Sequence, residues 1–220
     1  MRRSTWLLVA TSLVAGLSYP LLWDHLPNAA DMAVKGSAVG LLALAAAMRA
    51  RGPDGWLLSS VMALGAIGDV LLEVSLAAGA AAFASGHAVA IFLYRRNARP
   101  ELDQVDWAVG ALILLAAAMA PFLLLVGRAE ALPFTLYGLL LGAMAASAWL
   151  SRFPRRLTAA GALLFLASDM LIALRMGSDI AGLAPPIWLL YYAGQLLIFV
   201  GISSSPSEMG RGTRRSLVEG

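Results

Sequence analysis

The stretch GWLLSSVMALGAIGDVLLEV, residues 55–74, decides the fold class of this chain. It is as long as an α-helix that crosses a lipid bilayer, which needs about 20 mainly apolar residues. Its only charged residues are Asp69 and Glu73, which lie one helical turn apart. A charge at the centre of a spanning helix costs about 2.5–3.5 kcal/mol on insertion scales, so it requires a partner or a water-filled cavity. The stretch therefore predicts a membrane helix that contributes to a polar site.

Seven more apolar windows of similar length occur along the chain, separated by short polar connections. Of the 220 residues, 60% are hydrophobic and 13% are charged, and the mean hydropathy of +0.78 is far above that of a soluble domain. The eight windows are roughly 5–23, 30–48, 55–74, 76–95, 107–127, 131–150, 157–176 and 184–203. We therefore expect an all-α integral membrane protein, a bundle of eight transmembrane helices.

The basic residues support this number of helices, because cytoplasmic loops of membrane proteins are enriched in Lys and Arg. With eight helices, one side would hold Arg2, Arg3, Arg49, Arg51, Arg95, Arg96, Arg99, Arg152, Arg155, Arg156, Arg211, Arg214 and Arg215. The other side would hold only Arg128 and Arg175. This asymmetry predicts that both termini are cytoplasmic. It also explains the basic composition without nucleic acid as a partner.

No connection between the windows is long enough to separate soluble domains, so residues 1–203 are expected to form one transmembrane domain. Residues 204–220 read as a disordered cytoplasmic tail. The pattern small–Asp–x–Leu–aliphatic occurs at 68–72 and again at 168–172, which is compatible with a parallel repeat of four helices plus four. Fifteen arginines against one lysine, with abundant Ala and Gly, indicate a G+C-rich bacterial genome. The expected location is the cell membrane, as a multi-pass protein of a bacterial inner membrane.

Five ionisable residues lie inside the windows: Lys35, Asp69, Glu73, His87 and Asp169. In the expected topology they share one layer with Tyr191, Tyr192 and Gln195, from the centre of the membrane to its non-cytoplasmic half, and could line a single cavity. Such residues either specify the packing of helices or form a functional site. Glu73, at the outer end of its helix, is also compatible with a solvated position.

The residue types narrow the chemistry of this layer. There is no cysteine and only one histidine inside a window, which gives no pattern for a metal site. No G-x-S-x-G motif indicates a serine nucleophile. Two Asp residues in a low-dielectric pocket do not both ionise easily, so one is expected to hold a proton while the other stays charged. Such a pair supplies a general acid together with a base or cation stabiliser.

The segments GDVLLEV (68–74), FASGHAVAIFLY (83–94), GALLFLASDMLIALR (161–175) and LLYYAGQLLIFVG (189–201) together resemble the YhhN family of membrane lysoplasmalogenases. Lys35 near the start of the second window also fits, although Gly36 follows it where the family usually has Pro. The resemblance covers about residues 30–203. It implies hydrolysis of the vinyl ether bond of lysoplasmalogens, the alkenyl glycerophosphoethanolamines and glycerophosphocholines, to a fatty aldehyde and a glycerophospho head group.

The resemblance also points to Asp69 and Asp169 as the catalytic residues, with no metal or organic cofactor. Their individual roles stay unassigned. The surrounding residues are expected to position water, adjust the acidity of the carboxyl groups or bind the polar head: Lys35, Glu73, His87, Ser168, Tyr191, Tyr192 and Gln195. The expected partners are a lysoplasmalogen or related lysolipid and the membrane lipids, and the oligomeric state is open.

Two other functions are compatible with the same residues. An intramembrane Lys and two Asp residues at matching places in a repeat also suit a proton-coupled transporter. A carrier site usually involves broken helices, whereas the third and seventh windows contain no proline. A carboxylate pair that stabilises a cation could also serve a hydrolase of another ether lipid or of an epoxide.

Overall fold

The computed structural model of the chain describes residues 3–178 and 180–205, and in these ranges it contains eight long α-helices, one short π-helix and no β-strand. The helices are α1 (Arg3–Leu22), α2 (Asn28–Arg49), α3 (Pro53–Leu72), α4 (Leu76–Arg96), α5 (Gln104–Leu124), α6 (Ala131–Leu150), α7 (Ala160–Gly177) and α8 (Ala184–Ser203). The π-helix, η1 (Arg155–Ala159), leads directly into α7.

The prediction of an all-α membrane bundle is confirmed. Each of the eight described helices, with η1 counted as part of α7, is long and apolar enough to cross a membrane. Each predicted window agrees with its helix to within about three residues at both ends. Most of the predicted tail, residues 206–220, lies outside the described part of the chain. The cytoplasmic orientation and the four-plus-four repeat stay predictions.

Local sequence signals explain where the helices around the site begin. Pro53 opens α3 directly after Gly52, because proline suits the first turn, where no backbone N–H is needed. Ser75 caps α4 by accepting a hydrogen bond from the backbone N–H of Ala78. Asp103 caps α5 in the same way through the N–H of Asp106, at 2.7 Å. These local signals explain the residues at which α3, α4 and α5 begin.

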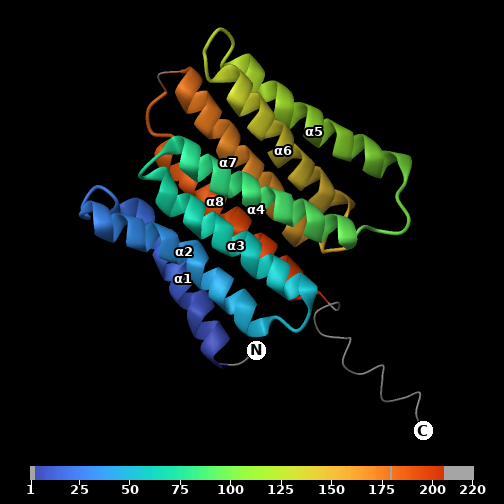
Figure 1. Cartoon of the computed structure of the whole chain (residues 1–220), viewed down its shortest axis with the longest axis horizontal. Helices are drawn as coiled ribbons and strands as arrows, with labels where there is room; N and C mark the ends of the chain where they lie inside the picture. The colour runs from blue at the N-terminus through green and yellow to red at the C-terminus, as the bar shows by residue number, and fades with distance from the viewer. Residues whose placement is uncertain (1–2, 179, 206–220) are drawn as a thin grey trace.

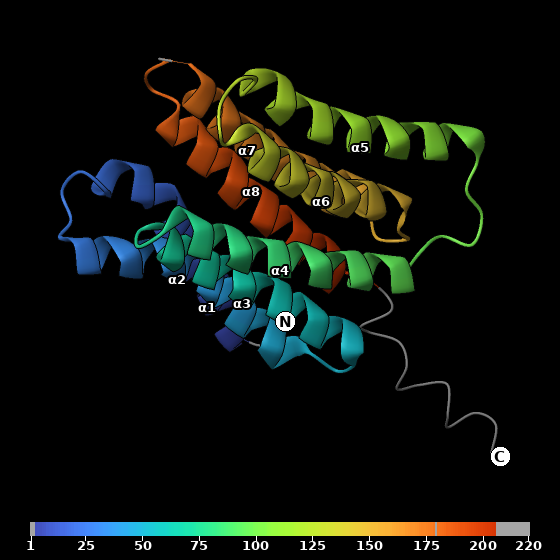
Figure 2. The same ribbon diagram turned by 45° about the horizontal axis from the view of Figure 1, so that its top comes forward.

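The helices form two groups that meet along α8 and where α4 packs against α6. Helices α1 to α4 pack in sequence on one side, and α5 to α7 lie on the other, with α8 running between the groups (Figure 1, Figure 2). Glycines permit the close approach of α7 and α8. A Cβ atom at Gly194 would lie 2.7 Å from the carbonyl oxygen of Gly161, and the reverse contact is equally tight. Membrane helices commonly associate through such small residues, because backbones then come into contact.

Helix α1 begins, and α2, α4, α6 and α8 end, at one end of the bundle (Figure 1). Most of the arginines in the described residues lie in the sequence at or beside these helix ends. Arg96 forms an ion pair of 2.7 Å with the buried Asp54. Asp106 binds both Arg99 and Arg155, and the guanidinium of Arg49 donates to the carbonyl oxygen of Ser203. The arginine-rich end is therefore closed by polar contacts between helices. The polar layer predicted from the sequence lies toward the opposite end.

Candidate active site in an intramembrane cavity

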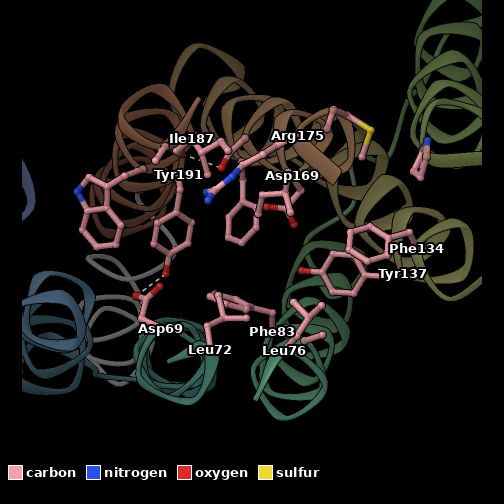
Figure 3. Close-up of a pocket in the computed structure, with 18 of the residues that line it drawn as sticks. Asp69, Leu72, Leu76, Phe83, Phe134, Tyr137, Asp169, Arg175, Ile187 and Tyr191 are labelled. Atoms are coloured by element: carbon pink, nitrogen blue, oxygen red, sulfur yellow. Dashed lines mark hydrogen bonds between the residues drawn. The ribbon is translucent and has the colours of Figure 1, made fainter. Parts of the chain in front are cut away.

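A cavity of about 570 Å³ occupies the end of the bundle opposite the arginines. Its volume lies in the usual range for small-molecule sites. Every long helix contributes to its wall, and most of the lining is apolar or aromatic, including Leu72, Leu76, Phe83, Phe134, Phe165, Ile187 and Trp188. Figure 3 shows these side chains around an open centre into which two carboxyl groups project. The cavity thus combines an apolar container with a few polar groups.

Asp69 enters the cavity from the last turn of α3 and is almost fully buried. The hydroxyl group of Tyr191 on α8 donates a hydrogen bond of 2.7 Å to its carboxylate. Gln195, one turn further along α8, donates to the same hydroxyl oxygen at 3.3 Å. Gly65 makes room for this chain, because a Cβ atom there would lie 2.7 Å from the Gln195 amide nitrogen. Asp69 is therefore held by Tyr191 of the central helix, whose hydroxyl group Gln195 holds in turn.

Asp169 enters from the middle of α7, on the opposite wall (Figure 3). The hydroxyl group of Tyr137, from α6, points toward its carboxyl group (Figure 3). Tyr137 in turn lies 3.1 Å from Nε2 of His87 on α4, within hydrogen-bond distance. His87 is buried and packs against the edge of Phe165. The position of the Asp169 carboxyl group is thus set by Tyr137, whose hydroxyl group is itself positioned by His87.

The two carboxyl groups face one space without touching. Among residues 3–178 and 180–205, no hydrogen bond joins Asp69 to Asp169, and the labelled side chains lie on opposite walls (Figure 3). Two carboxyl groups that are separated by a gap can act on opposite sides of a bound group, with room for water between them.

Lys35 lines the cavity from α2, but its partner is Glu73 and not one of the Asp residues. The Lys35 ammonium forms an ion pair with the Glu73 carboxylate, where α3 ends. About a third of the Glu73 side chain is exposed, so it lies near water and is nevertheless paired. Lys35 therefore forms a polar bridge between α2 and the end of α3.

Four more of the predicted residues take different positions. Ser168 borders the cavity, but its hydroxyl group donates to the backbone carbonyl oxygen of Ile187 at 2.8 Å and so ties α7 to α8. Gln195 and His87 lie behind the cavity and reach it through the two tyrosines. Tyr192 points away: its ring packs on Gly16 of α1, and its hydroxyl lies 2.9 Å from that of Ser12. Consecutive helical residues are separated by about 100° around the axis, so Tyr191 and Tyr192 face different neighbours.

Sequence reasoning missed two polar groups of the cavity. Tyr137 lies near the middle of the window 131–150 and is the only tyrosine in it, which would have been a usable signal. Arg175 counts as a loop charge in the topology argument, yet its guanidinium projects into the cavity from the last turn of α7 (Figure 3). Six residues along a helix leave Arg175 about 120° around the axis from Asp169, so it is the long Arg175 side chain that brings its guanidinium to the same cavity.

The fold and the cavity define a polytopic membrane protein with a buried carboxylate site between its helices. The chain belongs to the YhhN family, whose sequence model matches residues 30–202. Proteins named lysoplasmalogenase from Mycobacterium bovis and Mycobacterium tuberculosis are each 34% identical to it over 181 residues, covering 77% of this chain and 69% of theirs. No solved structure matches the chain.

Proposed function

We propose that the chain is a lysoplasmalogenase, which hydrolyses the vinyl ether bond of lysoplasmalogens with Asp69 and Asp169 as the acid and the base. The name of its relatives and its membership of the YhhN family support the general activity. The observation that carries the mechanism is the cavity itself, in which two carboxyl groups from α3 and α7 face each other across an apolar space.

The reaction requires a proton donor and a water molecule. One Asp transfers its proton to the alkene carbon that is not bonded to oxygen, which leaves an oxocarbenium ion at the carbon bonded to oxygen. The other Asp, ionised, accepts a proton from water as the water attacks that carbon. In the resulting hemiacetal, the hydroxyl group returns a proton to the first Asp as the bond to the glycerol oxygen breaks. The glycerol oxygen takes the proton of the second Asp, a fatty aldehyde leaves, and both carboxyl groups regain their starting states. The net reaction consumes one water molecule for each vinyl ether bond and requires no oxidant.

The side chains around the two carboxyl groups suit this mechanism. Phe83, Phe165 and Tyr191 form an edge-to-face cluster, with ring centroids 5.1–5.9 Å apart. Aromatic faces attract cations, so this cluster would stabilise positive charge that develops beside the carboxylates. The tyrosine hydroxyls at Asp69 and Asp169 orient the two carboxyl groups before substrate arrives. Preorganised groups of this kind account for much of the rate enhancement in many enzymes.

The shape of the helices favours an enzyme over a carrier. Helices α3 and α7, which hold the two Asp residues, are each continuous α-helix with no interior proline. A carrier usually binds its substrate where spanning helices are broken. The cavity is also confined to one end of the bundle, whereas the arginine-rich end is closed by buried side chains such as Tyr94, Asn97 and Met144.

The test is aldehyde release by purified protein in detergent, with lysoplasmalogen as substrate. We expect Asp69→Asn and Asp169→Asn each to reduce kcat/KM at least about a hundredfold, the usual scale for general acid–base catalysis. Asp24→Asn removes a carboxyl group from the exposed loop after α1 and serves as the matched control. A saturated alkyl-ether analogue should not react, because it has no alkene carbon that can accept a proton. Full activity in either cavity variant would contradict the two-Asp mechanism.

A further inference from the structure

One cationic side chain that lines the cavity, Arg175, has no role in the hydrolytic mechanism proposed above. The charged residues that line the cavity are Lys35, Asp69, Glu130, Asp169 and Arg175. The two Asp residues belong to the reacting centre proposed above, and Lys35 is neutralised by its ion pair with Glu73. Arg175 is different: among residues 3–178 and 180–205, no carboxylate lies within 4.0 Å of its guanidinium.

The direction of the Arg175 side chain argues against a simple interfacial anchor. An arginine near the end of a spanning helix commonly extends along the helix surface toward the lipid head groups. Arg175 is an exposed residue, but its guanidinium extends between Tyr191 and Asp169 at the wall of the cavity (Figure 3). A cation held there is directed at whatever occupies the cavity.

The distance along α7 from Asp169 to Arg175 would allow an anionic group of the substrate to bind Arg175 while the reacting bond lies near Asp169. Six residues separate it from Asp169, which corresponds to a rise of roughly 9 Å along the helix axis. In an extended lysolipid, the glycerol backbone places phosphorus about 6 Å from the ether oxygen at standard bond lengths, and somewhat further from the alkene carbon. A phosphate at Arg175 would therefore place the scissile group near the carboxyl groups, while the apolar wall takes the hydrocarbon chain.

We propose that Arg175 binds the phosphodiester of the substrate head group and so selects lysophospholipids over neutral ether lipids. The guanidinium matches phosphate oxygens with two parallel donors, and such charge-assisted pairs are stronger than neutral hydrogen bonds. This inference rests on the proposed function in one respect: it assumes that the occupant of the cavity is an ether lysolipid.

Binding measured without turnover separates the two proposals. The ligands are a saturated alkyl-ether glycerophosphoethanolamine and the corresponding alkylglycerol without phosphate, neither of which can react by vinyl ether protonation. Trp188 and Trp23 line the cavity, so their fluorescence is a convenient readout. We expect Arg175→Gln to weaken binding of the phospholipid analogue at least about tenfold and to change binding of the alkylglycerol less than about twofold. Arg175→Lys should recover part of the difference, since it restores charge but not the paired donors.

The matched control is Arg128→Gln, because Arg128 lies in the α5–α6 loop and does not line the cavity. It should bind both analogues like the unmodified chain. Equal loss of both ligands in Arg175→Gln would overturn the proposal, because a merely structural arginine would not distinguish them. Competition by inorganic phosphate that matches the lipid in strength would also overturn it, since the site would then recognise the free anion.

Failure of the proposed function would look different. If the chain releases no aldehyde but Arg175→Gln still weakens binding of the phospholipid analogue alone, the phosphate site stands and the hydrolytic assignment falls. If aldehyde is released and the discrimination is absent, the hydrolysis stands and the Arg175 proposal falls.

Discussion

The hydroxyl group of Tyr191 donates a hydrogen bond of 2.7 Å to the carboxylate of Asp69 and so joins the central helix α8 to the end of α3. The two residues are 122 positions apart in the chain. The same hydroxyl accepts a hydrogen bond from Gln195. A buried carboxylate with one defined donor has a fixed orientation, which a catalytic group requires.

Removal of that hydroxyl should affect catalysis more than folding. We expect Tyr191→Phe to reduce kcat for aldehyde release about tenfold to a hundredfold, because Asp69 loses its orienting donor. Tyr192→Phe is the matched control: the neighbouring hydroxyl contacts Ser12 outside the cavity, so kcat should stay within about twofold. Equal effects of the two substitutions on kcat would contradict this assignment.

The second tyrosine should behave in the same way toward Asp169. Tyr137→Phe removes the hydroxyl that lies between Asp169 and His87, and we expect a loss of about tenfold in kcat with the thermal unfolding temperature nearly unchanged. Steady-state kinetics and thermal unfolding of the same samples provide the comparison. Tyr94→Phe is a suitable control, because the buried Tyr94 hydroxyl has no hydrogen-bond partner among the described residues. A large fall in the unfolding temperature of Tyr137→Phe alone would indicate a structural role.

The proposed protonation at carbon leaves an isotopic signature. In D₂O, the aldehyde formed at early times should carry one deuterium on the carbon next to the carbonyl, because that carbon receives the proton from the acidic Asp. Mass spectrometry of the trapped aldehyde measures the incorporation, and authentic aldehyde incubated under the same conditions corrects for later exchange. Product without deuterium beyond that background would exclude protonation of the alkene as the first step.

The ion pair between Lys35 and Glu73 should stabilise the contact of α2 with α3. Lys35→Gln and Glu73→Gln are each expected to lower stability, and the double variant should lose less than the sum, with a coupling of about 1 kcal/mol. The modest figure reflects the partial exposure of Glu73. Unfolding in detergent measures the four members of the cycle. Strictly additive losses would mean that the two charges do not interact.

Because α7 and α8 are in tight contact, a larger side chain at Gly194 is expected to destabilise the protein strongly. We expect Gly194→Val to lower the free energy of unfolding by more than about 3 kcal/mol, because its side chain would collide with the Gly161 backbone. Gly52→Ala is the control, since nothing lies within 4 Å of a Cβ atom there. Normal stability of Gly194→Val would mean that the two helices are able to separate.

The membrane architecture of this protein was determined by the sequence itself. A spanning helix is recognised from about 20 consecutive apolar residues, which is a local property of the chain. The helix ends were also accessible, because Pro53, Ser75 and Asp103 mark them locally. Asp69 and Asp169 were identified for a related reason: a charge in an apolar window is costly and therefore conspicuous.

Only the tertiary structure decided which polar groups meet. Whether Lys35 pairs with an Asp or with Glu73 depends on how α2 and α3 rotate about their axes, and that rotation is fixed by packing along their whole length. The same holds for the choice between Tyr191 and Tyr192, for Tyr137 beside Asp169 and for the Arg175 guanidinium at the wall of the cavity. Pairings between distant segments leave no periodic trace in a single sequence, because they arise only when close contacts such as Gly161 with Gly194 set the positions of the helices.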